Sequence, residues 1–284
     1  MSEITPDIAA RYDGLHLNTP TVTAASVARE DCRLRIIARN GVGFDNVDVA
    51  ACTSKRITVT NTPVAIQRPV AVAALTLVFA LSGRLMAKDK LVRSGRWNDR
   101  TDFMGTGLTG RTLGLIGAGG IGQELIPLAR PFFRQIIVTD PYVETGTLAA
   151  MGASKVSFKD VLSDADFVVA ACPLNAQTHH LMNADAFAMM KTTASFINVA
   201  RGPVHDEAAL INALQSNQIA SAALDVTEQE PIDPANPLIG MENVILTPHA
   251  LCWTDECFEA IARTALRSIV DHSLGNTPKH VVSA

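Results

Sequence analysis

The chain of 284 residues has few aromatic side chains and no excess of positive charge. Phe, Trp and Tyr make up 5% of it, so aliphatic side chains must fill its interior. Its 24 Lys and Arg are outnumbered by 28 Asp and Glu, which gives a formal net charge of -4. Such a chain has no basic field to attract a phosphate backbone or an anionic lipid surface. We therefore expect neither nucleic-acid nor membrane partners.

Cysteine is scarce and irregularly spaced. The five cysteines form no Cys-x-x-Cys pair: Cys32, Cys52, Cys172, Cys252 and Cys257. An odd number without such a pair argues against a disulfide framework and against a zinc knuckle, so no metal site is predicted. The segment Met1 to Asp13 carries acidic residues and no apolar run, unlike a secretory signal. Reduced thiols in the cytoplasm are the simplest interpretation.

No apolar run reaches the ~18 residues that a membrane-spanning helix needs. The longest extends from Pro69 to Gly83, between Arg68 and Arg84, and we predict a buried helix there. The composition is 48% hydrophobic and 18% charged, which is typical of a compact globular enzyme. The length favours two domains.

Short aliphatic runs alternate with helical patterns along the chain, which predicts a parallel sheet covered by helices. The expected strands are Gly14–Leu17, Arg33–Arg39, Ile57–Asn61, Leu113–Ile116, Ile136–Thr139, Phe167–Ala171, Ser195–Asn198, Ala220–Leu224 and Val244–Leu246. The segment Pro69–Leu91 is too long and apolar for an ordinary crossover, so a domain boundary is placed near it. The segment Asp255–His272 has helical spacing and could return the chain to the first domain.

A glycine turn follows one of these strands. Gly117, Gly119 and Gly122 have the spacing Gly-x-Gly-x-x-Gly, and a helical pattern follows them. These glycines permit a tight turn, a close approach of pyrophosphate and close packing of helix on strand. The next aliphatic run ends at Asp140, 18 residues beyond Gly122. A carboxylate there can bind the ribose hydroxyls and would repel a 2′-phosphate, which favours NAD over NADP. The alternative is a glycine-rich turn followed by an ordinary turn aspartate before Pro141.

Further candidates follow other apolar runs. Arg201 has a planar guanidinium that suits a carboxylate beside a carbonyl, although a surface arginine would look the same. His249, after Pro248, can exchange a proton near neutral pH. Either Asp225 or Glu230 could orient its imidazole. His205 lies in a polar turn and has no obvious partner.

Taken together, these residues resemble the D-isomer-specific 2-hydroxyacid dehydrogenase family from about Tyr12 to His272. The motifs are Gly41-Val-Gly-Phe-Asp-Asn-Val-Asp48, Asn61-Thr-Pro63, Leu108-Thr-Gly-Arg-Thr-Leu-Gly114, the glycine turn, Ala200-Arg-Gly202, Ala223-Leu-Asp-Val226 with Glu230-Pro231, and Thr247-Pro-His249. The resemblance implies a Rossmann-type doubly wound sheet over residues 86–254, inserted in a smaller flavodoxin-like α/β substrate domain of residues 1–85 and 255–284. It also implies a homodimer.

The resemblance further implies the role of each site residue. Arg201 would hold the carboxylate of a small 2-oxo or 2-hydroxy acid, His249 would donate the proton in reduction, and Glu230 would pair with His249. The backbone amides of Val42 and Gly43 would also bind the carboxylate. The residues implied to bind NAD are Gly117, Gly119, Gly120, Ile121, Gly122, Asp140, Pro173, Val199, Ala200 and Asp225, the last near the nicotinamide amide.

The sequence also departs from the family pattern. The small, glycine-rich stretch usual after the histidine is replaced by Ala250-Leu-Cys-Trp253, Val72 stands where many relatives carry a glutamate, and Asn175 replaces a frequent threonine. Relatives have a few tens more residues before Tyr12. We therefore expect an N-terminally truncated substrate domain, or a partner that covers the gap. In the truncated form, Gly14–Leu17 would be an uncovered edge strand, with low stability or aggregation.

Two other functions remain open beside a 2-oxoacid reductase. This fold also serves as a dinucleotide-sensing binding protein in some relatives, although no basic segment supports that function here. Oxidation of phosphite or formate is the third possibility.

Overall fold

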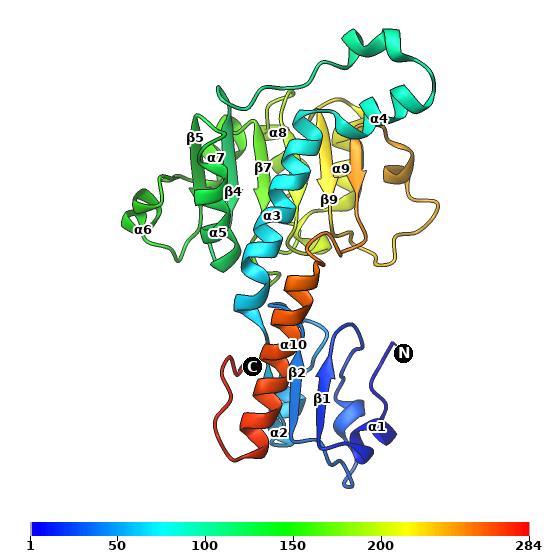
Figure 1. Cartoon of the computed structure of the whole chain (residues 1–284), viewed down its shortest axis with the longest axis vertical. Helices are drawn as coiled ribbons and strands as arrows, with labels where there is room; N and C mark the ends of the chain where they lie inside the picture. Colours follow the sequence, from blue (N-terminus) through cyan, green and yellow to red (C-terminus); the bar gives the residue numbers. More distant parts are fainter. Residues whose placement is uncertain (1, 284) are drawn as a thin grey trace. The chain divides into compact units, whose positions relative to one another are not determined.

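The computed structural model describes residues 2–283, which divide into two compact units (Figure 1). The central unit comprises Val70–Cys252, and the discontinuous unit comprises the chain up to Pro69 and from Trp253 onward. These boundaries differ from the expected ones near residues 85 and 255. The first lies inside a helix, because most of that helix packs in the central unit.

The central unit is built on a seven-stranded parallel sheet in the order β10-β9-β8-β7-β4-β5-β6. Its strands are β4 (Thr112–Ile116), β5 (Gln135–Thr139), β6 (Ser154–Lys155), β7 (Phe167–Ala170), β8 (Ser195–Asn198), β9 (Ser221–Leu224) and β10 (Val244–Leu246). Every residue of β4, β7 and β8 is buried, as expected of strands covered on both faces. The order reverses between β4 and β7, which is the doubly wound arrangement predicted from the sequence. Only the short, polar β6 was not foreseen.

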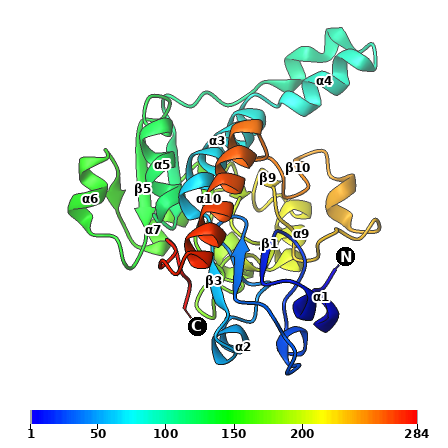
Figure 2. The same ribbon diagram turned by 60° about the horizontal axis from the view of Figure 1, so that its bottom comes forward.

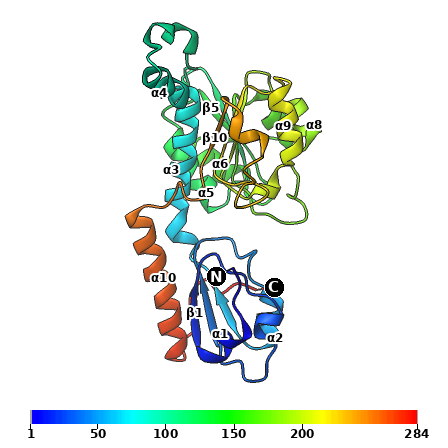
Figure 3. The same cartoon turned by 90° about the vertical axis from the view of Figure 1, so that its right-hand side faces the viewer.

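Helices cover both faces of this sheet. They are α5 (Gly120–Ala129), α6 (Thr145–Ala150), α7 (Phe158–Asp164), α8 (Ala184–Met189) and α9 (Glu207–Gln215), with α3 (Pro63–Ser82) and α4 (Leu85–Arg93) before them. Figure 3 shows α3 on one side of the strands and α8 and α9 on the other. Helix α7 approaches β4 closely at Gly114, where an added Cβ would lie 2.6 Å from the Cβ of Ala165.

Helix α3 is longer than expected. It begins at Pro63 instead of Pro69 and has 20 residues, so by length and composition alone it could span a membrane. The prediction that no apolar segment is long enough to span a membrane was therefore wrong. The helix nevertheless buries an aliphatic stripe that includes Ala71, Ala74, Leu77 and Val78. A buried stripe is typical of a core helix, and a single apolar helix of this length is weak evidence of a membrane span.

The discontinuous unit has a three-stranded parallel sheet in the order β1-β2-β3. Its elements are α1 (Pro6–Arg11), β1 (Gly14–Leu17), β2 (Ile36–Arg39), α2 (Val49–Ser54), β3 (Thr58–Thr60) and α10 (Asp255–Ser273), with a 3-10 turn at Ala25–Val27. Figure 3 shows α10 on one side of this sheet and α2 on the other. The C-terminal segment pairs with β3, because the amide of Val282 donates to the carbonyl of Val59 at 2.9 Å.

The first residues of the chain contribute more to this unit than the sequence suggested. Thr5 caps α1, and Ile4 and Ala9 are buried in the core with Leu17 and Val22. Strand β1 is the edge strand, as expected, but Leu17 at its end is buried in the core of this unit. The expectation of low stability remains a prediction.

A projecting segment follows α3 in the central unit. Arg84 adopts the left-handed conformation with φ +50° and separates α3 from α4. Helix α4 and the 3-10 turn at Trp97–Phe103 then extend beyond the strand layer (Figures 1 and 2).

Candidate functional site

The candidate residues of the central unit gather at one edge of its sheet. Each follows the carboxyl end of a strand: the glycine turn after β4, Asp140 after β5, Pro173 after β7, Val199 to Arg201 after β8, Asp225 and Glu230 after β9, and His249 after β10. Ligands of open parallel sheets bind at this edge, near the point where the strand order reverses. The sheet therefore brings together residues that span more than 130 positions of the sequence.

The glycine turn has the conformation that its spacing predicts. Gly117 has φ +94°, and an added Cβ would lie 2.8 Å from the backbone of Cys172. A Cβ on Gly122 would lie 2.6 Å from the carbonyl oxygen of Gly117. Gly119, at the N-cap of α5, faces open space instead. The turn is thus closed where the backbone must pack and open where pyrophosphate would approach.

Asp140 is buried, and both of its oxygens accept backbone hydrogen bonds. Oδ2 accepts from Ala118 at 2.7 Å, and Oδ1 accepts from Tyr142 at 2.8 Å and Val143 at 3.0 Å. The carboxylate therefore organises the glycine turn as well as its own turn. Oδ1 already accepts two bonds, whereas Oδ2 accepts one and keeps a second lone pair, which leaves capacity for a ribose hydroxyl.

These residues fit a dinucleotide. The first N–H groups of a ten-residue helix lack acceptors within the helix, and its dipole favours an anion at this end. The open side of Gly119 leaves these groups accessible. Gly117, Gly119, Gly120, Ile121 and Gly122 are positioned to hold pyrophosphate.

His249 and Glu230 form a hydrogen-bonded pair, with 2.8 Å between Nδ1 of the imidazole and Oε2 of the carboxylate. Burial would raise the pKa of Glu230. The hydrogen bond and charge of His249, the Thr227 amide and the charge of Arg201 outweigh that effect and lower its pKa. The carboxylate is therefore ionised beside the imidazole, and Nε2 of His249 is left for another partner.

Asp225 does not contact the imidazole, which resolves the choice between the two acids in favour of Glu230. Its Oδ1 accepts from the Thr247 hydroxyl at 2.5 Å and from the amides of Ala250 and Leu251 at 3.2 Å each. His249 itself adopts a left-handed conformation with φ +53°, which is unusual for a residue with a Cβ. Asp225 thus holds the strained turn that presents His249.

The turn that carries Arg201 is held by Asn198. Asn198 is fully buried, and its Oδ1 accepts from the Ala200 amide at 2.9 Å. Its Nδ2 donates to the Arg201 carbonyl at 2.9 Å. The Arg201 guanidinium donates to the Ala200 carbonyl at 2.7 Å, and its charge acts on Glu230. Arg201, Glu230 and His249 therefore form one charged cluster.

Val42 and Gly43 belong to the discontinuous unit and follow β2. Gly41, with φ +83°, donates to the Thr62 hydroxyl at 2.7 Å, and the Asn61 side chain donates to the Val42 carbonyl at 2.8 Å. These bonds fix the Gly41–Gly43 turn at the carboxyl edge of its own sheet. Their role toward a substrate stays a prediction.

Three residues important to this geometry were missed or misjudged from the sequence: Asn198, Thr247 and His205. Asn198 ends strand β8, just before the Ala200-Arg-Gly202 motif, and Thr247 begins the Thr247-Pro-His249 motif after β10. A polar side chain at each of these strand ends was the available signal. His205 was placed in a polar turn with no obvious partner, but it is completely buried and meets the Asn198 side chain. No local pattern indicates this burial.

The fold and this edge define a nicotinamide-dinucleotide-dependent dehydrogenase. Residues 75–250 match the family model described as D-isomer specific 2-hydroxyacid dehydrogenase, NAD binding domain. The chain belongs to the D-isomer-specific 2-hydroxyacid dehydrogenase family, and it is an NAD-dependent oxidoreductase that interconverts 2-hydroxy and 2-oxo acids.

Known relatives support this assignment. The chain is 35% identical over 254 residues to a glyoxylate reductase of Korarchaeum cryptofilum, covering 88% of this chain and 76% of that protein. It is 35% identical over 277 residues to a D-3-phosphoglycerate dehydrogenase of Synechocystis, covering 98% of this chain but only 50% of that protein. The structure of a glyoxylate reductase from Paecilomyes thermophila has a TM-score of 0.87 and 29% identity, with 96% of this chain and 85% of that one covered.

Proposed function

We propose that this chain reduces a short 2-oxo acid, with Arg201 binding the substrate and His249 and Glu230 acting as the acid/base pair. The observation that carries the proposal is the 2.8 Å hydrogen bond between His249 and Glu230. Glu230 accepts from Nδ1, so the proton that can be donated to a substrate is the one on Nε2. Arg201 supplies the positive charge that a carboxylate and a polarised carbonyl need.

Each residue then has a separate task in the reaction. The Arg201 guanidinium orients the 2-oxo acid through its carboxylate. NADH, which the glycine turn and Asp140 would hold, would supply the hydride for the 2-oxo carbon. His249 transfers its Nε2 proton to the carbonyl oxygen, and Glu230 stabilises the imidazolium before that transfer. The products are the 2-hydroxy acid and NAD⁺.

A small substrate such as glyoxylate is proposed, because two of the relatives above are named glyoxylate reductases. The turn after His249 also favours a short acid, since Leu251 and Trp253 are bulkier than the small residues usual there. A panel of glyoxylate, hydroxypyruvate, pyruvate, phenylpyruvate and phosphite, followed by NADH absorbance in both directions, tests the choice. Activity with phosphite alone would contradict it.

Substitution of the two basic residues tests their roles. His249→Ala should lower kcat by ~10²-fold or more and leave NADH binding within about twofold, because the lost group transfers a proton. Arg201→Ala should raise KM for the 2-oxo acid and lower kcat. The exposed His179 and Arg263 provide matched controls, and His179→Ala and Arg263→Ala should retain activity. Near-normal turnover of either site variant would refute the assignment.

Glu230→Gln tests the pairing. The neutral amide removes a charge that favours the protonated imidazole, so reduction should lose half its rate at a lower pH than in the unaltered protein. A steady-state pH profile of kcat/KM measures this. An unchanged profile would show that Glu230 does not act on His249.

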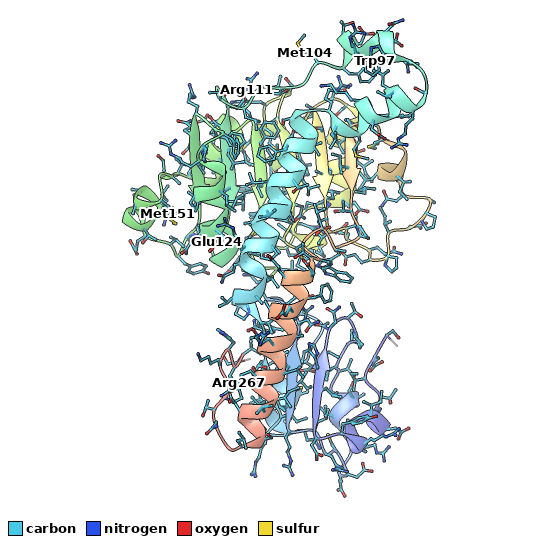
Figure 4. All side chains as sticks on the ribbon, in the orientation of Figure 1. Trp97, Met104, Arg111, Glu124, Met151 and Arg267 are labelled. Atoms are coloured by element: carbon cyan, nitrogen blue, oxygen red, sulfur yellow. The ribbon has the colours of Figure 1, made fainter. Side chains whose placement is uncertain are left out.

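We also propose a homodimer formed through an apolar surface on α3 and the projecting segment. Several large apolar side chains are exposed there: Val72, Phe79, Leu85, Met86, Val92, Trp97 and Met104. Figure 4 shows Trp97 and Met104 on the projecting segment. A group of large exposed apolar side chains is typical of a protein–protein interface.

A cytoplasmic location is the last part of the proposal. Cys32, Cys52 and Cys172 are free thiols. Burial raises the pKa of Cys52 and Cys172 to about 11, so these two are poor nucleophiles and inert in a reducing compartment. Cell fractionation of the tagged chain tests this location.

A further inference from the structure

His205 is a completely buried histidine beside the turn that carries Arg201. It follows the 3-10 turn Gly202–Val204, and its amide donates to the Gly202 carbonyl at 3.0 Å. The imidazole packs edge-on to Phe196, with 5.8 Å between ring centroids. It takes no part in the proposed proton transfer, so its burial needs another explanation.

The hydrogen bonds of Asn198 determine which atoms of His205 can donate. The Ala200 amide can only donate, so the atom of Asn198 that it meets at 2.9 Å must be the carbonyl Oδ1. The amide Nδ2 therefore faces the Arg201 carbonyl at 2.9 Å and Nδ1 of His205 at 3.0 Å. It donates one hydrogen to each. Nδ1 of His205 must consequently be an unprotonated acceptor, and the ring proton is on Nε2.

This arrangement leaves Nε2 of His205 unsatisfied. It is buried and meets no hydrogen-bond acceptor among residues 2–283. An unsatisfied buried donor destabilises the folded state, a cost that an apolar side chain of similar volume would avoid. The one polar contribution of the imidazole that offsets this cost is the acceptor that it offers to Asn198.

We propose that His205 is a positioning residue for Arg201, acting through the Asn198 side chain. The Nδ1 atom fixes the rotation of the carboxamide, and the carboxamide in turn holds the Ala200 amide and the Arg201 carbonyl. This inference rests on the proposed role of Arg201 in binding the substrate carboxylate. Without the acceptor, the carboxamide loses one of its three bonds, and the Arg201 turn loses its defined geometry.

The charges around the imidazole are compatible with this role. Burial lowers the pKa of His205 to about 4, with His180 acting in the same direction, while Glu228 and Asp206 oppose the change. The ring is therefore neutral at pH 7, and Nδ1 stays free to accept. His180 is hydrogen-bonded to Glu228, and these two neighbours act on the pKa of His205 in opposite directions.

Two substitutions separate positioning from packing. In His205→Asn, the amide oxygen can replace the Nδ1 acceptor but leaves a cavity, whereas His205→Leu fills the volume without an acceptor. If His205 positions Arg201, the leucine variant should raise KM for the 2-oxo acid about tenfold, and the asparagine variant should stay within about threefold. The melting temperatures should follow the opposite order, with leucine at least as stable. Affinity for NADH should stay within twofold in both.

A double-mutant cycle with Asn198→Ala completes the test. If His205 acts through Asn198, the effect of His205→Leu on KM should disappear when Asn198 is already alanine. Additive effects, or activities that follow the melting temperatures, would overturn the positioning role. Failure of Arg201→Ala to raise KM would instead overturn the proposed function, so the two failures can be distinguished.

Discussion

Asp140 illustrates how a single side chain can serve both structure and specificity. Its carboxylate holds the glycine turn through Ala118, and its position after β5 is where the resemblance implies the adenosine ribose. A negative charge at this point would repel the 2′-phosphate of NADP. The preference for NAD therefore rests on a residue whose bonds also shape the pyrophosphate turn.

Asp140→Ala should reduce the preference for NADH over NADPH at least tenfold. NADH loses ribose hydrogen bonds, and NADPH is relieved of repulsion. Isothermal titration calorimetry of both dinucleotides with the unaltered and variant proteins measures the ratio of dissociation constants. Asp185→Ala, at the exposed first turn of α8, is the control and should leave the ratio unchanged. An unchanged ratio in the Asp140 variant would contradict the assignment.

His205 should make folding stability depend on pH below neutrality. Its pKa is about 4 in the folded chain and ~6.5 when unfolded, so between these values the unfolded state binds more protons. Stability therefore rises with pH through this window and is fully present above it. Acidification from pH 7 to 4 should cost about 3 kcal/mol through this group. Urea unfolding at several pH values measures the effect, and His205→Leu should remove it. Parallel pH dependences of the two proteins would disprove the buried neutral state.

The loop that carries Arg201 meets the loop that carries Glu230 at Gly202. A Cβ added to Gly202 would lie 1.9 Å from the Thr227 carbonyl oxygen and 2.6 Å from the Glu228 nitrogen. Both contacted atoms belong to the backbone, so they cannot move aside as the end of a flexible side chain could. The spacing between Arg201 and Glu230 thus depends on the absence of one methyl group.

Gly202→Ala should therefore separate the loops, destabilise the central unit by ~2 kcal/mol or more and lower kcat/KM. Gly240 is a matched control, since an added Cβ there meets nothing within 4 Å. Denaturant unfolding and steady-state kinetics on both variants check the prediction. Equal behaviour of Gly202→Ala and Gly240→Ala would refute the proposed loop contact.

Formation of the proposed homodimer would bury the exposed apolar side chains of α3 and the projecting segment. Trp97 is 61% exposed and Met104 80% exposed. In a homodimer, these side chains would be removed from water at the interface, and a stable interface usually buries ~800 Å² per partner. The projecting segment then has a function that a single copy cannot supply.

Trp97→Glu combined with Met104→Glu should convert the proposed dimer into a monomer at micromolar concentration. Dimer formation would bury the new carboxylates without positively charged partners. Light scattering coupled to size-exclusion chromatography measures the mass. Ile239→Glu, 50% exposed elsewhere in the central unit, should leave the mass unchanged. A monomer in the unaltered protein would contradict the homodimer directly.

Local patterns were sufficient for every strand except β6 and for the conformation of the glycine turn. Strands β1, β8 and β10 have the predicted bounds, because short aliphatic runs with turn residues on either side leave little choice of ends. The glycine turn and Asp140 were found for a similar reason: the backbone geometry that binds pyrophosphate depends on residues within one strand–turn–helix–strand unit. The family motifs supplied the order of the remaining site residues.

The tertiary structure alone decided which side chains meet. The residue patterns by themselves left open whether Asp225 or Glu230 pairs with His249, and only the family resemblance favoured Glu230. This pairing and the burial of His205 beside Asn198 depend on loops from different strands. The same is true of α3, whose first turn at Pro63 has no apolar run to mark it. Sequence patterns report the neighbours of a residue along the chain, but burial and hydrogen bonding depend on neighbours in space, and these are fixed only when the sheet places distant strand ends side by side.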